Sequence, residues 1–310
     1  MKAIECLKYG DVENLVLRNI KKPTPKDNEI LIKIHATAVT ASDVLIRKME
    51  EAPHLKFMLQ IIFGFRRPRN PVLGMITSGI VERKGKNVTL FEIGDEVFAY
   101  GSISPTKRRF GSYAEYICLP ENWNLALKPV NLSFEEAAAI PYGGLLASHL
   151  LKKTSINRGD KVLIYGASGS IGTMAIQLAK HMGAHVTSVC SGRNFELVTS
   201  LGSDKMIDYT LENAEKQLER YEYVIDAVGN SKSSKLKEKS KKALTSNGKY
   251  ISIDLGTPST TKEAFFNLKT LVEQEKIIPV IDRIYPLEKI AEAHRYVEMG
   301  HKRGNVVVTI

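Results

Sequence analysis

The middle of the chain alternates short apolar runs with stretches in which apolar residues recur at helical spacing. Val162, Leu163 and Ile164 form one such run, and the apolar positions of residues 171–179 fall on one face of a helix. Helical connections between short buried strands require a parallel sheet with helices on both faces. The pattern therefore predicts a doubly wound α/β domain, with further strands at residues 185–189, 205–207, 223–226 and 249–253 and helices from residue 194, within 231–242 and from residue 262.

The first 125 residues show a different pattern, in which strand-like stretches are separated by glycine and proline turns. These stretches lie at residues 29–36, 80–82, 94–99 and 112–118. β-Branched residues are frequent in residues 33–39, which extend the first stretch, and Gly94 with Asp95 forms a turn before the apolar part of the third. The pattern predicts an antiparallel, barrel-like domain.

The end of the chain returns to strands. Residues 280–284 and 305–310 have strand character, with a helical stretch at 287–299 between them. We expect this tail to rejoin the first domain. The predicted division is therefore a substrate domain formed by residues 1–125 and 277–310, and a nucleotide-binding domain formed by residues 126–276.

A glycine-rich turn joins the first parallel strand to its helix. Its three glycines are spaced three residues apart, where glycine permits a tight turn, close approach of a phosphate and close packing of helix on sheet. The helix that follows offers unpaired backbone N–H groups to an anion. In this context a dinucleotide site is favoured over a purely structural turn. The residues predicted to bind the cofactor here are Gly166, Ala167, Ser168, Gly169, Ser170, Ile171 and Gly172.

Composition indicates a globular protein. The chain has 310 residues, of which 43% are hydrophobic and 25% charged, enough for two domains with separate cores. The first ten residues lack an apolar signal region, and the longest apolar stretch, residues 57–65, is too short to span a bilayer. We therefore expect a cytoplasmic protein without stable membrane insertion. Cys6, Cys118 and Cys190 lack paired spacing, which argues against disulfides and a structural zinc site.

The net charge of +10 raises the question of a polyanionic partner. The densest basic run, residues 231–242, holds six lysines and one glutamate, with no aromatic residues among them. A solvated helix face is therefore favoured over a polyanion site, and no nucleic-acid partner is expected.

Several motifs run in the order found in one known family. The chain resembles the medium-chain dehydrogenase/reductase superfamily, and within it the zinc-free quinone oxidoreductases related to zeta-crystallin. The resemblance implies a Rossmann doubly wound parallel sheet together with a GroES-like antiparallel β-barrel domain. The matching segments are VTASD at 39–43, GKNVTLFEIGDEVFA at 85–99, GSYAEYICLPE at 111–121, the glycine-rich turn, DAVG at 226–229 and HRYVEMGHKRGNVVVTI at 294–310.

Zinc-dependent relatives carry a cysteine near Thr40, a His-Glu pair near residues 74–76 and a four-cysteine lobe. This chain has Thr40 and Ile76 at those positions and no cysteine between residues 82 and 111. Threonine and isoleucine do not replace thiolate or imidazole as zinc ligands. The resemblance therefore implies no metal.

The end of the second parallel strand indicates which nicotinamide cofactor is bound. An NAD-selective site places a carboxylate there for the ribose hydroxyls. This chain instead has Ser191, Arg193 and Asn194, groups suited to a 2′-phosphate, and no carboxylate before Glu196. NADPH is therefore favoured. By family position Tyr209 would lie against the adenine or its phosphate, and a half-buried tyrosine at a strand end is an equally weighted alternative.

The carboxyl ends of the later strands face the same crevice. Ala227, Val228 and Gly229 follow the fourth strand, and Leu255 with Gly256 follows the fifth, so their backbone groups should contact ribose and nicotinamide. Ordinary strand-to-helix turns remain an alternative for the two glycines.

The resemblance implies hydride transfer from NADPH to a small-molecule quinone or α,β-unsaturated carbonyl compound in the cleft between the domains. Thr40 is a candidate hydroxyl near the nicotinamide. Tyr142 is a candidate proton donor or aromatic wall, and a packing role is an equal alternative. Residues 54–69 should cap the cleft, with a core helix or a membrane-touching surface as alternatives.

Two departures from the family, Ile76 and Leu146, motivate a second hypothesis together with the basic surface, and a third departure concerns the oligomeric state. Relatives have an acidic residue at Ile76 and a threonine at Leu146, and they insert a further helix and a sheet-edge strand between Gly256 and Lys262. That strand often forms the dimer interface, so a homodimer stays open, because the strand is either truly absent or missing from this sequence. The second hypothesis is a nucleotide-binding protein without enzymatic activity, such as a redox sensor or an RNA-binding relative of the crystallin type.

Overall fold

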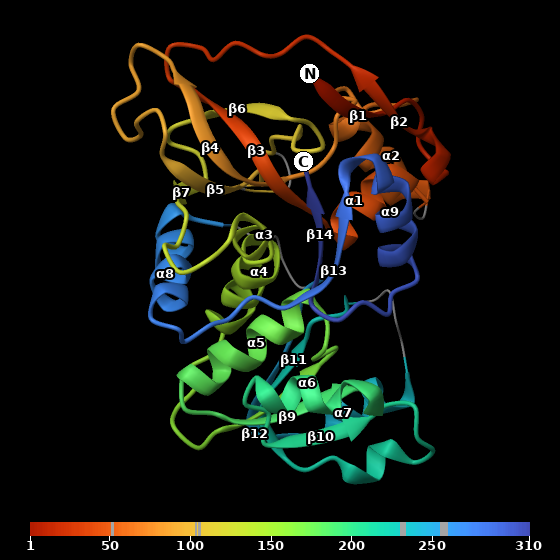
Figure 1. Ribbon diagram of the computed structural model, residues 1–310. Coiled ribbons are helices and arrows are strands. Elements are labelled where there is room, and N and C mark those ends of the chain that lie inside the picture. The colour runs from red at the N-terminus through yellow and green to blue at the C-terminus, as the bar shows by residue number, and fades with distance from the viewer. Residues whose placement is uncertain (51–52, 103, 105–106, 230–233, 255–259) are drawn as a thin grey trace.

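The computed structural model describes residues 1–50, 53–102, 104, 107–229, 234–254 and 260–310. Within them, a five-stranded parallel sheet lies in one half of the molecule and a mainly antiparallel sheet in the other (Figure 1). The parallel sheet has the order β10-β9-β8-β11-β12, so the chain starts at its centre and builds toward one edge and then the other. Its strands are β8 (Lys161–Tyr165), β9 (His185–Cys190), β10 (Lys205–Asp208), β11 (Tyr221–Asp226) and β12 (Leu244–Ser252).

Both faces of the parallel sheet are buried. Val162 and Ile164 of β8 belong to the largest hydrophobic cluster, whereas Leu163 and Tyr165 face a second cluster on the opposite side. Alternation of side chains along a strand explains the split, and burial of both faces explains why the strand is continuously apolar. The doubly wound sheet expected from the sequence is confirmed.

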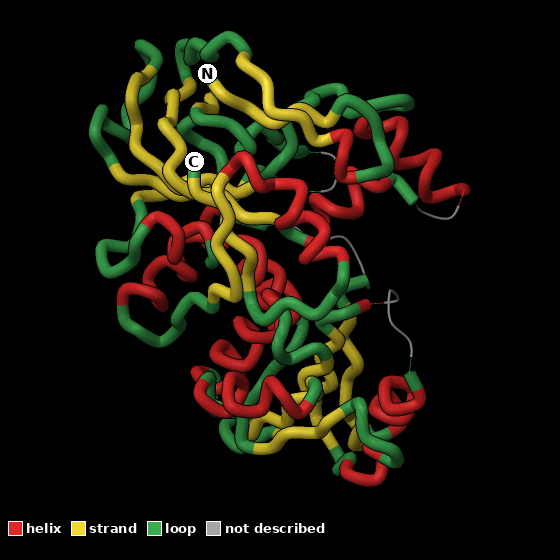
Figure 2. Tube along the Cα trace, turned by 45° about the vertical axis from the view of Figure 1, so that its right-hand side comes forward, coloured by secondary structure: helices red, strands yellow, loops and turns green. Residues whose placement is uncertain are grey.

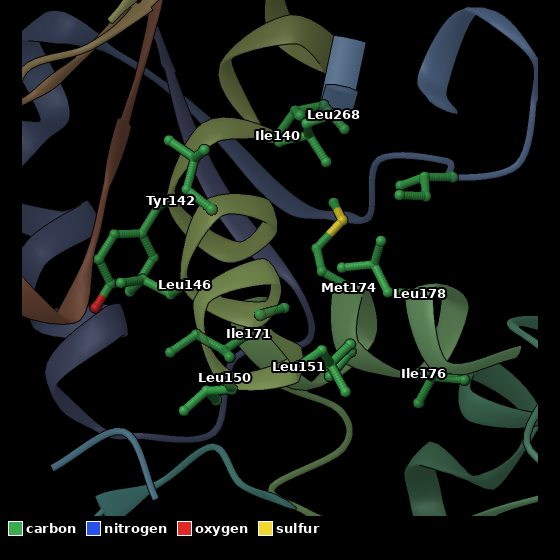
Figure 3. Packing of buried hydrophobic residues seen from close by; sticks show 14 of the residues in the cluster. Ile140, Tyr142, Leu146, Leu150, Leu151, Ile171, Met174, Ile176, Leu178 and Leu268 are labelled. Carbon is green, nitrogen blue, oxygen red and sulfur yellow. The ribbon is translucent and has the colours of Figure 1, made fainter. Parts of the chain in front are cut away.

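Helices cover the two faces unequally. Against one face pack α4 (Pro141–Leu151), α5 (Ser170–His181) and α8 (Lys262–Glu273), whose side chains interlock in the largest cluster (Figure 3). The other face is covered by α7 (Lys235–Lys242) and the 3-10 turn η3 (Ala214–Gln217), through Leu236 and Ala214. The short helix α6 (Phe195–Ser200) follows the 3-10 turn η2 (Gly192–Asn194) and packs beside β10.

The second sheet has the order β13-β14-β3-β4-β5-β7, with β6 paired to β3. The pairs are antiparallel except β13 with β14, and one face encloses a separate apolar cluster that includes Ile30, Ile32 and Val97. The expected antiparallel domain is therefore present. Its strands are β3 (Glu29–Val39), β4 (Ile76–Lys84), β5 (Glu96–Tyr100), β6 (Tyr116–Pro120), β7 (Leu125–Leu127), β13 (Ile281–Pro286) and β14 (Asn305–Thr309).

Smaller elements surround this sheet. An antiparallel pair is formed by β1 and β2, and the helices α1, α2 and α3 precede α4 along the chain. These elements are β1 (Lys2–Cys6), the 3-10 turn η1 (Val12–Asn14), β2 (Leu15–Asn19), α1 (Ala41–Lys48), α2 (Pro53–Phe63) and α3 (Phe134–Ala138).

The end of the chain rejoins the first domain, as the sequence predicts. After α8 the chain forms β13, the 3-10 turn η5 (Leu287–Lys289), α9 (Ile290–Glu298) and β14, and β14 pairs antiparallel with β3. Both termini therefore lie in the half that holds the antiparallel strands (Figure 2). The domain boundaries at residues 125 and 277 stay predictions.

Several predicted elements begin or end elsewhere in the structure. β4 starts at Ile76 rather than at residue 80, because its extra residues pair with β5, whereas β3 ends at Val39 as the β-branched stretch predicts. β6 starts at Tyr116 rather than at residue 112. Within the described part of the lysine run a helix spans Lys235–Lys242, and the later residues 244–248 belong to β12.

The lysine run is not wholly solvated, contrary to the favoured interpretation. Lys237 is 3% exposed and forms an ion pair of 2.7 Å with Asp226. Lys237 on α7 therefore holds the carboxyl end of β11 through this ion pair. Among the residues that the structure describes, no helix has the length and apolar character needed to cross a bilayer.

Candidate functional site

A cleft of about 720 Å³ opens at the carboxyl ends of the parallel strands. Its walls come from the loops after β8, β9, β10 and β11, from α4, and from the segment between α9 and β14. Ligand crevices of open α/β sheets lie at this edge, where successive loops diverge.

Most of the residues predicted to bind a cofactor meet in this cleft. They come from four separate loops, so the tertiary structure joins segments spread over more than sixty residues. Those that line it are Gly166, Ser168, Gly169, Ser170, Ile171, Gly172, Ser191, Arg193, Asn194, Tyr209, Ala227 and Val228.

Two predicted cofactor residues within the described part of the chain, Ala167 and Gly229, do not line the cleft. Ala167 is fully buried beneath the turn, where its N–H donates to the Val189 carbonyl over 3.1 Å. Gly229 is buried beside Asp226, whose Oδ1 accepts its N–H over 3.1 Å. Leu255, like the neighbouring Gly256, lies outside the described residues.

The glycine-rich turn has the backbone geometry that its sequence predicts. Gly166 has a φ of +81°, a left-handed conformation that disfavours side chains with a Cβ. A Cβ on Gly172 would approach the Gly166 carbonyl oxygen to 2.2 Å, so that glycine sets how closely α5 packs on β8. Gly169 is the N-cap of α5 and, as glycine, makes no side-chain hydrogen bond to the first N–H groups of the helix. These groups face the cleft and suit an anion.

The loop after β9 is held by hydrogen bonds from neighbouring segments. Asn194 is buried, and its amide donates to the Ser168 hydroxyl over 3.0 Å, which ties this loop to the glycine-rich turn. The N–H of Gly192 donates to Asp208 Oδ2 over 2.8 Å. Arg193 is exposed at the cleft edge, beside Tyr209, which is 44% exposed.

Asp208 is the one carboxylate that sequence reasoning passed over at this end. Burial opposes its ionisation, but hydrogen bonds from Thr210 and from the Gly192 N–H outweigh burial and hold its pKa below the usual range. Both oxygens are thus used to shape the loop, and the side chain does not line the cleft.

Asp226 organises the loop after β11. Its carboxylate accepts from the Val228 and Gly229 N–H groups, from the Tyr250 hydroxyl at 2.6 Å and from Lys237. Burial opposes ionisation here too, yet these partners keep the pKa of Asp226 below its usual value. The loop that presents Ala227 and Val228 to the cleft is therefore fixed from below.

Thr40 lies outside the cleft. It is 3% exposed and caps α1, where its N–H and hydroxyl donate to Asp43 Oδ2 over 2.9 and 2.6 Å. This capping box consumes the hydroxyl that the sequence offered as a catalytic candidate. The next residue, Ala41, lines the cleft in its place.

Tyr142 stands between the cleft and a smaller pocket of about 130 Å³. Its ring projects from α4 next to Leu146 (Figure 3), and its hydroxyl lies 3.3 Å from the Ser42 hydroxyl. Burial raises the pKa of the phenol, so it stays protonated and can donate. Tyr142 also belongs to the hydrophobic core, so packing and pocket roles coexist.

The smaller pocket combines polar groups with an apolar wall. It joins the large cleft through two shared residues, Tyr142 and Ile253. Its lining residues are Ser42, Tyr100, Ser102, Arg108, Tyr142, Leu146, Ile253 and Thr260.

Sequence reasoning missed the residues that the tail contributes to the cleft. Gly300, His301 and Lys302 line it. The tail is held there because the Gly304 N–H donates to the Ser168 carbonyl over 2.8 Å and because Asn305 Oδ1 accepts from Ser170 at 2.6 Å. The motif at 294–310 contained these residues, but local spacing gives no sign that they return to the glycine-rich turn.

Two further expectations concern segments beside the cleft. None of the described residues of 54–69 lines either pocket, although the Phe63 ring lies 5.4 Å from the Arg108 guanidinium. Ile76 is fully buried in β4. Across the described parts of the chain, no group of three or more His, Cys, Asp or Glu side chains is placed to hold a metal ion.

Comparisons with known families agree with the two-part fold. Residues 26–129 match the family described as alcohol dehydrogenase GroES-like domain, and residues 256–308 match the one described as zinc-binding dehydrogenase. A quinone oxidoreductase structure from Coxiella burnetii is similar, with a TM-score of 0.85, 28% identity and coverage of 100% of this chain and 99% of that one.

Full-length relatives are also found by sequence. The chain is 33% identical to a chloroplastic NADPH-dependent alkenal/one oxidoreductase of Arabidopsis thaliana, over 99% of this chain and 79% of that protein. It is 34% identical, with the same coverage of each chain, to a 2-methylene-furan-3-one reductase of Solanum lycopersicum. By its sequence, its two sheets and its glycine-rich cleft, the chain belongs to the medium-chain dehydrogenase/reductase superfamily.

Proposed function

We propose that this protein is an NADPH-dependent, zinc-independent oxidoreductase that transfers hydride to a quinone or to an α,β-unsaturated carbonyl compound. The observation that carries the proposal is the continuous cleft from the Arg193 loop, across the glycine-rich turn, to Tyr142. Its length and chemistry suit a dinucleotide, with an acceptor pocket at the far end. The Arabidopsis and tomato relatives, named for alkenal/one and furanone reduction, support this substrate class.

The residues present fit the cofactor in order along the cleft. Arg193 and Ser191 would hold the 2′-phosphate, with Tyr209 beside the adenine. The first N–H groups of α5 would face the pyrophosphate, together with Lys302. The nicotinamide would then lie near Tyr142, Ala227 and Ile253, where the smaller pocket begins.

When bound, the cofactor supplies the hydride. The chain itself positions the acceptor, keeps water away and supplies a hydrogen-bond donor. Tyr142 meets two of these needs, because its ring forms part of the pocket wall and its protonated hydroxyl lies within reach of Ser42.

Zinc independence is proposed on the identity of the residues at the family's ligand positions. Thr40 replaces the cysteine and uses its hydroxyl to bind Asp43, and Ile76 carries no donor atom. Polarisation of the acceptor would then depend on protein groups alone.

A turnover assay tests the proposal. Purified protein should consume NADPH when supplied with a panel of quinones and enones, and should do so equally well after treatment with a chelator. Binding of NADPH without turnover of any acceptor would contradict the enzymatic part and favour the non-enzymatic nucleotide-binding alternative. Absence of NADPH binding would contradict both.

A reducing compartment such as the cytoplasm is proposed as its location. Cys6, Cys118 and Cys190 are all free thiols, which is typical of proteins kept from oxidising environments. Some relatives are named as chloroplastic or mitochondrial, so cell fractionation decides among the three compartments.

The oligomeric state can also be tested by experiment. One edge of the described parallel sheet is β12, and we propose that without a further strand beside it the protein is a monomer. Light scattering during gel filtration would give its mass, and a stable dimer would contradict this proposal.

A further inference from the structure

The smaller pocket holds one cation in an otherwise neutral lining. Arg108 is the basic residue among its described lining residues, where it faces the phenol groups of Tyr100 and Tyr142. The guanidinium lies 5.4 Å from the Phe63 ring, and its buried Nε has no hydrogen-bond partner in the described parts of the chain. A buried donor without a partner is costly, which points to a ligand that accepts from it.

The groups next to the Arg108 guanidinium already have other hydrogen-bond partners. Asp43 attracts Arg108, but the Asp43 Oδ2 atom already accepts two hydrogen bonds from Thr40. The Thr260 hydroxyl donates to the Ser102 carbonyl over 2.7 Å and so is committed within the pocket wall. Burial lowers the pKa of Arg108 from its high usual value, and the side chain keeps its charge at neutral pH.

The adjacent arginine has an ordinary structural role. Arg109 is exposed, lies 3.6 Å from Glu29 and packs over the Trp123 ring at 5.7 Å. Arg108 and Arg109 therefore have different surroundings, and of the two only Arg108 lines the smaller pocket.

The proposed reaction creates a negative charge that needs such a partner. Addition of hydride to the β-carbon of an enone forms a C–H bond, opens the C=C π bond and places an electron pair on the carbonyl oxygen as an enolate. The reduced cofactor is oxidised in the same step, and a proton from water at the α-carbon then gives the saturated ketone. A quinone gains its charge on an oxygen in the same way. A fixed cation beside that oxygen stabilises the transition state.

We propose that Arg108 binds the acceptor oxygen on which this charge develops, with Tyr142 as its neighbouring donor. The proposal rests on the proposed function, because the pocket adjoins the end of the cleft assigned to the nicotinamide. It defines the substrates as compounds whose carbonyl oxygen reaches Arg108 while the reacting carbon faces the cleft.

Variants at Arg108 and Arg109 test this role. Arg108→Met should lower kcat for cyclohexenone and crotonaldehyde by about 100-fold, the loss typical of a removed oxyanion donor. Arg108→Lys should recover part of that loss, because it keeps the charge without the planar fork. Arg109→Met is the matched control and should change kcat less than about twofold. Equal losses in the two methionine variants would overturn the proposal.

A binding measurement separates this role from a structural one. Calorimetry with para-nitrophenolate, an oxyanion mimic, should show a Kd about tenfold weaker in Arg108→Met than in wild type. Nitrobenzene, which lacks the oxyanion, should bind both proteins alike. Equal loss of the two ligands would indicate a collapsed pocket and contradict oxyanion recognition.

Cofactor binding distinguishes failure of this inference from failure of the proposed function. Fluorescence titration with NADPH should give the same Kd for wild type, Arg108→Met and Arg109→Met. If wild type binds NADPH but reduces no acceptor, the proposed function fails, and the nitrophenolate comparison still decides whether Arg108 recognises an oxyanion.

Discussion

Arg193 and Asn194 are neighbours in sequence with different tasks at the cleft. Asn194 is buried and ties its loop to Ser168, whereas Arg193 is exposed at the edge where the 2′-phosphate would lie. The buried Asn194 therefore positions the loop, whereas the exposed Arg193 would contact the ligand.

Cofactor selectivity follows from this arrangement. Arg193→Ala should weaken NADPH binding by about 1–3 kcal/mol, because a charge-assisted contact to the 2′-phosphate is lost. NADH lacks that phosphate and should bind with nearly unchanged affinity. Fluorescence titration of both cofactors checks this, with Arg158→Ala as an exposed arginine control away from the cleft. Equal losses for the two cofactors would contradict the assignment of Arg193.

Two buried titratable residues, Asp43 on α1 and His294 on α9, have opposite effects on the pH dependence of stability. Burial raises the pKa of Asp43 to about 6, against the hydrogen bonds from Thr40 that favour its charged form. Burial, with a smaller effect of Arg47, lowers the pKa of His294 to about 3. As pH rises from about 4 to 6, the folded state loses stability through Asp43 and gains it through His294, because the ordinary values are 3.8 and 6.5.

Removal of the Asp43 carboxyl should reveal the pH dependence of stability that His294 causes. In Asp43→Asn the free energy of unfolding should rise more steeply with pH than in wild type, by about 1.4 kcal/mol per pH unit between pH 4 and 6. Urea unfolding at several pH values measures the slope. The exposed carboxylate of Asp27 provides a control, since Asp27→Asn should leave the slope unchanged. Identical slopes in wild type and Asp43→Asn would rule out a raised pKa at Asp43.

At the scale of elements, the glycine-rich turn is a packing joint between β8 and α5. A Cβ on Gly172 would meet the Gly166 carbonyl oxygen at 2.2 Å and the Ala167 Cα at 2.6 Å, both backbone atoms that cannot move aside cheaply. A Cβ on Gly169 would meet only the Gly166 carbonyl oxygen, at an ordinary 3.5 Å. Close packing therefore requires glycine at position 172, whereas the space around Gly169 would accept a Cβ.

The pair Gly172→Ala and Gly169→Ala tests this difference. Gly172→Ala should lower the free energy of unfolding by about 1–3 kcal/mol, the usual cost of overpacking, and weaken NADPH binding as α5 shifts. Gly169→Ala should keep the wild-type stability within about 0.5 kcal/mol, because its φ of −82° suits alanine. Thermal unfolding and cofactor titration measure both effects. Greater damage from Gly169→Ala would contradict the packing argument.

At the scale of the whole molecule, the cleft is completed by the end of the chain. Lys302 reaches it because β14 pairs with β3 while Gly304 and Asn305 bond to the turn before α5. Burial lowers the pKa of Lys302 to about 8, and Asp282 opposes that change. The pyrophosphate end of the site therefore depends on contact between the two halves of the molecule.

Lys302→Met should weaken NADPH and NADH alike, in contrast to Arg193→Ala, because both cofactors share the pyrophosphate. In wild type the affinity should fall as pH rises through about 8, since only the charged ammonium attracts phosphate, and the variant should lose this dependence. Titrations between neutral and alkaline pH check both points. Lys289→Met, on an exposed lysine paired with Glu292, is the control. A pH dependence that persists in Lys302→Met would assign it to another group.

Much of the architecture is predictable from the chain alone, for a physical reason. The apolar run at 162–164, the glycine spacing at 166–172 and the polar residues at 191–194 lie in contiguous segments, so their strand, turn and loop character is a local property. The rule that such loops meet at the carboxyl ends of parallel strands then places them in one cleft. Boundaries such as the start of β4 at Ile76 depend on pairing with β5 and differ from the predicted start at residue 80.

The sequence by itself determined the two kinds of sheet, the return of the tail and a dinucleotide-type turn, because period and glycine spacing are local. Tertiary structure alone decided that Thr40 caps α1 instead of facing the cleft, and that Lys302 lines the same cleft as the glycine-rich turn. It also decided that Arg108 and Tyr142, on different elements, share one pocket. These outcomes depend on contacts between residues far apart in the chain, which no local pattern encodes.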